Sequence, residues 1–319
     1  MRQKTTSLIT GMLIILLALP AMAGDWIDAD FAIGVDRIHG ETAYRIGGTY
    51  QTPGGTANTN NPLSELCFPL EIFMASAQAD IVVADRVAIL LSARTGLTDE
   101  TRDMQDSDWT SSAYPSWRTI YSESRTDMDA TELSGRLRYN LYTTHLTGIA
   151  VHTREQYNLS FWAGLGYLNE EFEFTASDTL QFSQDSGFSS GFFPGPTLTY
   201  DITYTIPYLE FAATLNVDNK TDLNFSVGYS PYAEAEDEDN HLQRNRVSKA
   251  ECEGEATLLS LDTRFALTKH WFTGFSVDYR YIEADGPSVT LVNGAWNNTI
   301  NEEIESEQSI FSVNIGCRF

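Results

Sequence analysis

The last nine residues constrain the fold of this chain more than any other segment. From Phe311 to Phe319, every odd position is apolar and every even position is small or polar. A period of two is typical of a β-strand with one apolar and one polar face. A polar inner face, an apolar outer face and aromatic residues at the strand ends are typical of membrane-spanning β-barrels.

The same alternation recurs in five further segments, which are residues 133–141, 159–167, 223–229, 259–267 and 271–281. Apolar side chains take the odd positions, whereas Arg136, Arg138 and Arg264 take even ones. A charge that faces lipid is costly, so we expect these arginines to face a polar lumen. A soluble β-sandwich would bury the apolar face instead, and the pattern alone does not exclude it.

We predict an all-β fold, a transmembrane antiparallel β-barrel of about ten strands with long outer loops. The expected strands are residues 28–50, 66–84, 86–104, 127–143, 156–177, 197–217, 221–237, 251–268, 270–285 and 303–319. The outer loops would be residues 51–65, 105–126, 178–196, 238–250 and 286–302. The turn at 144–155 is longer than a periplasmic turn needs. Pro207 interrupts the period, which predicts a bulge in its strand.

The N-terminus has the pattern of a secretory signal peptide. Arg2 and Lys4 precede an apolar stretch from Leu8 to Leu19, and Ala21-Met22-Ala23 forms an A-x-A cleavage site. We therefore expect residues 1–23 to be a signal peptide and residues 24–319 to be one barrel domain. No later apolar stretch is long enough for a transmembrane helix, so a membrane location would require a barrel.

The composition limits the classes of binding partner that the chain could have. The formal net charge is −24, which disfavours nucleic acid and favours cationic peptides. The three cysteines are odd in number and form no C-x-x-C, so neither a disulfide framework nor a zinc site is indicated. Cys317 is expected to face lipid, and whether Cys67 and Cys252 pair stays open.

Two short acidic clusters contain the candidate catalytic residues. They are Asp106-Ser107-Asp108-Trp109 and Asp237-Glu238-Asp239-Asn240-His241. Side chains two residues apart on an extended chain share a face, so each cluster would present paired polar groups. A carboxylate beside an imidazole raises its basicity, and crowded carboxylates shift each other's pKa. We expect the two clusters to face each other across the barrel mouth, where a water held between them could be deprotonated.

These motifs, in this order, resemble the omptins, a family of outer-membrane endopeptidases with a ten-stranded barrel. Further matches are Glu123-Ser124-Arg125, Phe174-Thr175-Ala176, Pro207-Tyr208 and the closing strand that ends in Phe319. The resemblance implies a bacterial outer-membrane protease with its active site facing the cell exterior. It would cleave exposed peptides next to Arg or Lys by water attack.

The resemblance also implies roles for individual residues. Asp239 and His241 would be a catalytic dyad, with Asp106 and Asp108 as the opposing pair and Asp106 sharing the water with His241. Glu41 and Asp237 would bind the basic side chain of the substrate, which two carboxylates favour through charge-assisted hydrogen bonds. No metal or cofactor is implied.

One departure concerns lipopolysaccharide, which omptins need as an activator and hold through a Tyr-x-Glu-x-Arg stretch. The matching stretch here is Tyr167-Leu168-Asn169-Glu170-Glu171, and the more distant basic positions match Thr203 and Glu255. With Glu171 in the place of the arginine, we expect a different lipid contact or independence from lipopolysaccharide.

Other interpretations remain open. Acidic outer loops can solvate a surface, so the alternative is a non-catalytic barrel that serves adhesion or cation binding. A calcium site is disfavoured because D-x-D-x-D-G is missing, and zinc because too few His or Cys residues lie nearby. His39, His145, His152 and His270 are interpreted as structural or solvated. The natural substrate and the oligomeric state are not predicted.

Overall fold

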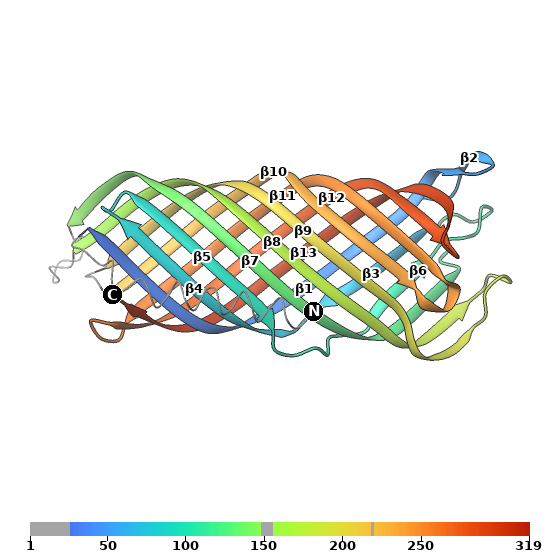
Figure 1. Ribbon diagram of the computed structural model, residues 1–319, viewed down its shortest axis with the longest axis horizontal. Coiled ribbons are helices and arrows are strands. Elements are labelled where there is room, and N and C mark those ends of the chain that lie inside the picture. The colour runs from blue at the N-terminus through green and yellow to red at the C-terminus, as the bar shows by residue number, and fades with distance from the viewer. Residues whose placement is uncertain (1–25, 148–155, 218–219) are drawn as a thin grey trace.

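The computed structural model describes residues 26–147, 156–217 and 220–319 (Figure 1). The predicted signal peptide, residues 1–23, lies outside them. The strands are β1 (Ile27–Thr52), β2 (Gly55–Asn58), β3 (Ser64–Leu70), β4 (Phe73–Val83), β5 (Val87–Gly96), β6 (Met104–Asp108), β7 (Ile120–Thr147), β8 (Gln156–Ser183), β9 (Gly191–Val217), β10 (Thr221–His241), β11 (Arg246–Ala266), β12 (Trp271–Val292) and β13 (Ala295–Arg318). A 3₁₀ turn, η2 (Leu242–Arg244), follows β10.

These strands form one antiparallel sheet that closes on itself, because β13 pairs with β1 from Asp30 to Gln51. Two positions in the ring are each shared by two segments. The segments β4 and β3 both pair with β1, and β5 and β6 both pair with β7. The ring therefore has about ten strands, as predicted. Within the described residues, no helix is long and apolar enough to cross a membrane.

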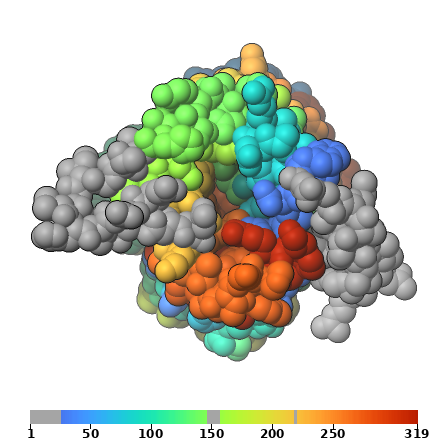
Figure 2. Space-filling view, turned by 90° about the vertical axis from the view of Figure 1, so that its left-hand side faces the viewer, coloured from blue at the N-terminus to red at the C-terminus, as the bar shows by residue number. Residues whose placement is uncertain are grey.

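Short connections lie at the end that carries the C-terminus, and β2, β3 and β6 lie at the opposite, outer end (Figure 1). Figure 2 looks onto the C-terminal end, where β5, β7, β12 and β13 surround a central recess. Near this end the odd positions are exposed and apolar, as at Leu137, Leu165, Phe225 and Phe275. This apolar band is the surface that a β-barrel presents to lipid.

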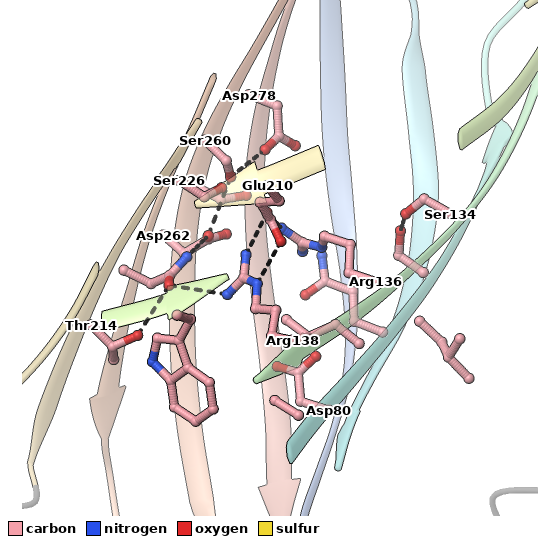
Figure 3. Close-up of a pocket in the computed structure, with 18 of the residues that line it drawn as sticks. Asp80, Ser134, Arg136, Arg138, Glu210, Thr214, Ser226, Ser260, Asp262 and Asp278 are labelled. Carbon is pink, nitrogen blue, oxygen red and sulfur yellow. Dashed lines mark hydrogen bonds and ion pairs between the residues drawn. The ribbon is translucent and has the colours of Figure 1, made fainter. Parts of the chain in front are cut away.

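The lumen inside the apolar band is polar, as predicted for Arg136, Arg138 and Arg264. A cavity of about 490 Å³ is lined by these arginines and by lumen carboxylates. Arg138 binds Glu210 through two 2.7 Å hydrogen bonds (Figure 3), while Arg264 pairs with Asp30 and Asp80. The charges of the cavity wall are thus largely matched within the wall.

Above the apolar band, the pattern of the two faces is inverted. In β9, Ile202, Tyr204 and Ile206 are buried inside the barrel, whereas Leu209 and Phe211 further down face outward. From Leu198 to Ala212 the even positions are all buried, so over this stretch only the chemistry of the inner face changes along the strand. The inner face of the outer half holds a core of stacked aromatic rings, including Phe68 and Tyr200 at 4.4 Å between centroids.

This inversion corrects the prediction of a bulge at Pro207. The β8–β9 register runs through Pro207 without a shift, opposite Tyr167. The extra residue lies instead in the neighbouring strand β10, where the register shifts between Ser230 and Ala233. Apolar residues change from even to odd positions near Pro207 because the outer half of the strand has an apolar inner face, whereas the part in the apolar band has an apolar outer face.

The predicted outer loops were also too long. Strand pairing continues through much of the segments 105–126, 178–196, 238–250 and 286–302, so the barrel extends well beyond the apolar band. At the other end, β7 continues to Thr147 and β8 begins at Gln156, and the remainder of the predicted turn lies outside the described residues. Polar residues in these strand extensions have the composition of loops. What makes them strands is pairing with residues of other strands, which is not visible in the local sequence.

The lumen network gives a test of stability. Arg94 binds Asp36, Glu132 and Asp278 at 2.7–2.8 Å and is almost fully buried. Arg94→Met leaves three carboxylates without their shared cation, so we expect a loss of about 3–5 kcal/mol in the free energy of unfolding. Urea titration of the refolded barrel measures it. Lys249→Met, which removes an exposed partner of Glu238, should cost less than about 1 kcal/mol.

Candidate active site

The bulge in β10 aims one acidic cluster into the barrel. Below it, the even residues Ser226 and Ser230 are buried; above it, the odd residues Ala235, Asp237 and Asp239 are buried. A shift of one residue exchanges the two faces of a strand. Without this bulge, Asp237, Asp239 and His241 would point to the outside and Glu238 would point inward.

The second cluster lies in a strand, not in the predicted loop. Asp106 and Asp108 belong to β6, which is held between β3 and β7. Asp106 stands opposite Leu66 in one neighbour and Ser122 in the other. Strand pairing on both sides fixes the two carboxylates two residues apart on the same face, as their spacing predicted.

Both clusters line one cavity of about 290 Å³ at the outer end of the barrel. Asp106, Asp108 and His241 all contribute to its wall, as do Tyr44 and Ile300. Further lining residues include Tyr50, Ser64, Phe188, Arg244, Arg246 and Asn298. The two sequence motifs, more than 120 residues apart, therefore meet as predicted.

His241 and Asp239 form a direct pair. The imidazole Nε2 lies 3.1 Å from Asp239 Oδ2, and the Tyr44 hydroxyl donates to the same oxygen at 2.5 Å. Burial acts to raise the pKa of Asp239, but His241, Tyr44 and Arg246 outweigh it and hold the pKa below its usual value. An ionised Asp239 fixes the imidazole with Nε2–H toward it, which leaves the Nδ1 lone pair to accept a proton.

The opposing carboxylates behave differently. Burial and the charge of Asp108 hold the pKa of Asp106 well above its usual value. Burial also raises the pKa of Asp108, against a hydrogen bond from Ser64. Asp106 Oδ1 is buried and has no hydrogen-bond partner among the described residues. The dyad, in which Asp239 is ionised, thus faces a pair of carboxylates that resist being ionised together.

A second pair of carboxylates lies one layer below the dyad. Asp237 accepts hydrogen bonds from the Tyr200 hydroxyl at 3.0 Å and from the Ala250 backbone N–H at 3.1 Å. It also shares a hydrogen bond with Glu302 of β13. Burial raises the pKa of Asp237 to about 6, and burial together with Asp237 raises the pKa of Glu302 well above its usual value.

Glu41 is not brought to this site. In β1, Thr42 and Tyr44 point inward, and the Thr42 hydroxyl lies 2.6 Å from that of Tyr204. Alternation places Glu41 on the outer wall, where it is exposed opposite Glu307. The second acidic side chain beside Asp237 is Glu302, which belongs to the segment predicted as a loop.

Comparison with known proteins identifies the family. The sequence profile of the Omptin family matches residues 56–319, which is most of the chain. The chain belongs to the omptin family. At the level of the family it is a protease of the bacterial outer membrane. A search of curated protein sequences gave no match.

One solved structure shares this fold, and a second matches it less closely. The outer membrane protease OmpT from Escherichia coli matches with a TM-score of 0.75 at 18% identity, covering 92% of this chain and 97% of that one. The outer membrane protein OprG from Pseudomonas aeruginosa matches with a TM-score of 0.41 at 10% identity, covering 92% and 95%.

Sequence reasoning missed three residues that this omptin places at the site, Tyr44, Glu302 and Arg246. Tyr44 and Glu302 occupy inward positions of strands, which the parity of β1 and β13 would have revealed once the strands were extended. Elsewhere in the described residues, Cys67, Cys252 and Cys317 are free, and no group of three or more His, Cys, Asp or Glu residues could hold a metal ion.

The contact between Tyr44 and Asp239 gives a prediction. Tyr44→Phe removes a hydrogen bond to an ionised carboxylate, which typically contributes about 1.5–3 kcal/mol, so we expect kcat/KM for a peptide to fall about 10- to 150-fold. Tyr204→Phe is the matched control, because it removes a buried hydroxyl that bonds Thr42 instead of the dyad. Equal losses in the two variants would contradict a specific role for Tyr44.

Proposed function

We propose that this omptin is an Asp/His endopeptidase that cleaves exposed peptides next to Arg or Lys. The observation that carries the proposal is the shared cavity, which His241, paired with Asp239, lines together with Asp106 and Asp108. No serine, cysteine or threonine nucleophile is required, because water is the attacking group.

The geometry supports the following sequence of events. A water between His241 and Asp106 gives a proton to the imidazole as its oxygen bonds to the carbonyl carbon. The π electrons of the carbonyl move to its oxygen, and a tetrahedral intermediate forms. The imidazolium, stabilised by Asp239, returns the proton to the leaving nitrogen as the carbon–nitrogen bond breaks. General-base catalysis of this kind contributes about 10²–10⁴-fold.

Specificity for a basic side chain is assigned to Asp237 and Glu302 in place of Glu41. Both are buried one layer below the dyad, about 6–7 Å along the strands, a distance that the length of an extended Arg or Lys side chain matches. The small side chain of Ser288 lies in the same cross-strand row as Asp237, and Ala235 is the next inward residue below it on β10. A bound guanidinium or ammonium would stabilise the charged form of both carboxylates.

Independence from lipopolysaccharide is supported by the outer wall above the apolar band. The exposed cross-strand row consists of Glu234, Glu253, Asp285 and Glu303 on four adjacent strands. A parallel row contains Glu255, Glu283 and Glu305. Arg45, which faces Glu303, is already paired with Glu65 and Glu305. Facing carboxylates repel each other and would repel a lipid phosphate even more strongly. Glu171 and Thr203, neighbours in the ladder, add no positive charge.

The catalytic roles are tested with a quenched peptide that contains Arg-Arg. We expect Asp106→Ala and His241→Ala to lower kcat by about 10²–10⁴-fold, because each removes one side of the water site. Lys249→Met, on the outer face, serves as the control for folding and charge. A folded parent with no more activity than both variants would refute the proposal and favour a surface-binding barrel.

The specificity pair predicts a pH dependence. As pH rises from 5 to 8, Asp237 and Glu302 lose their shared proton, because their pKa values are raised and that of Asp237 is about 6. The ratio of kcat/KM for an Arg peptide to that for its uncharged citrulline analogue should therefore increase with pH. The ionisation of the catalytic groups affects kcat/KM for both peptides equally, so it cancels in the ratio.

In this experiment Glu302→Gln should lower the ratio and flatten its rise, whereas Glu41→Gln on the outer wall should leave it unchanged. A ratio near one at every pH would show that the pair does not select basic residues. A ratio that responds only to Glu41→Gln would return the role to that residue.

The lipid requirement is measured on protein refolded in detergent free of lipopolysaccharide. We expect activity there, and a change of less than about threefold when lipopolysaccharide is added, because the outer wall repels phosphate. Complete inactivity that added lipopolysaccharide restores would contradict this expectation.

A further inference from the structure

Arg246 places a positive charge beside the catalytic dyad. It is the first residue of β11 and stands directly opposite His241 across the β10–β11 hairpin. Facing residues of an antiparallel pair project to the same side of the sheet. Both side chains line the outer cavity together with Asp106 and Asp108.

Unlike the arginines of the lumen, Arg246 is not matched by the wall around it. Arg94 contacts three carboxylates, Arg280 contacts two, and Arg138 is held by Glu210. Among the described residues, no carboxylate lies within 4.0 Å of Arg246, and its buried Nε has no hydrogen-bond partner. A buried donor without an acceptor is costly, which suggests that its partner arrives with the substrate.

The charge of Arg246 reaches both walls of the cavity. It acts on Asp239 and Tyr44 on the dyad side, and on Asp106 and Asp108 opposite. A carbonyl that is attacked between these walls would develop its negative charge within the same small space. Water attack creates that charge on the carbonyl oxygen, and a preorganised donor at this point is usually a large contribution to catalysis.

The other arginine of the cavity is less suited. Arg244 is exposed in the turn η2, and its guanidinium stacks over the Phe188 ring at 5.4 Å from the centroid. It therefore belongs to the rim, whereas Arg246 is anchored in the sheet by pairing with both β10 and β12.

We propose that the Arg246 guanidinium donates to the carbonyl oxygen of the scissile peptide and stabilises the oxyanion of the tetrahedral intermediate. The proposal rests on the water-attack mechanism above. The water oxygen bonds to the carbonyl carbon, the π electrons become the oxyanion lone pair, and Arg246 keeps its proton throughout. It makes Arg246 a catalytic residue of this omptin.

The test compares Arg246→Met and Arg246→Lys with Lys249→Met, which removes a cation from the opposite face of the same strand. We expect Arg246→Met to lower kcat about 10²–10³-fold with KM changed less than about threefold, the effect of losing one oxyanion donor. Arg246→Lys should recover part of kcat, because it keeps the charge without the planar fork.

A second readout separates this role from a merely positioning one. A peptide phosphonate mimics the tetrahedral anion, so its affinity should fall in Arg246→Met in proportion to kcat/KM. Because Arg246 also lowers the pKa of Asp239, Asp106 and Asp108, the rate of each variant is compared at its own pH optimum. Unchanged phosphonate affinity, or a loss of kcat that disappears at the optimum of the variant, would overturn the proposal.

The outcomes also distinguish the two proposals. If the parent cleaves peptide and Asp106→Ala does not, but Arg246→Met matches Lys249→Met, only the role of Arg246 fails. If the folded parent is inert, the water-attack mechanism fails and the role of Arg246 with it. Should Arg246→Met not fold, full activity of a folded Arg246→Gln would overturn the proposal equally well.

Discussion

The closure of the sheet between β1 and β13 is the constraint on which the other features depend. A backbone in lipid cannot leave its N–H and C=O groups unpaired, so a sheet that crosses a membrane must have no edge. Pairing from Asp30 to Gln51 meets this demand within the apolar band and continues far above it. The strands that close the barrel in the membrane continue into its outer half, so this half is also a closed wall. The residues of the site project from that wall.

The chemistry of the inward-facing side chains changes along the length of the barrel, although the strands run on without a break. Inward side chains are charged in the lumen of the apolar band and aromatic above it, and they become carboxylates again at the outer end. The aromatic layer connects the levels, since Tyr200 bonds Asp237 and Tyr44 bonds Asp239. Hydroxyl groups at the top of an apolar core thus hold the acidic side chains in place.

The sequence was sufficient for the parity of the strands and for the two motifs, because each depends on residues close together in the chain. The closed barrel followed from that parity, since strands with a polar inner face and an apolar outer face are typical of a membrane barrel. It was insufficient for Glu41 and Glu302, whose roles depend on which face each strand turns inward and on how far the strands extend. The parity change near Pro207 was real, but a lipid-facing surface and an apolar core produce the same pattern. Arg246 lay in a segment predicted as a loop, and an arginine in a loop gives no sign of the partners that it lacks in the folded barrel.

The placement of Asp106, Asp108, Asp239 and His241 on paired strands has a consequence for the choice of substrate. Each wall is already ordered by its ladder of hydrogen bonds, so the entropy lost on forming the complex falls mainly on the peptide. A segment that is part of a folded domain would have to unfold locally before it could lie between the two walls. The local stability of a target protein, as much as its sequence, would then decide where it is cut.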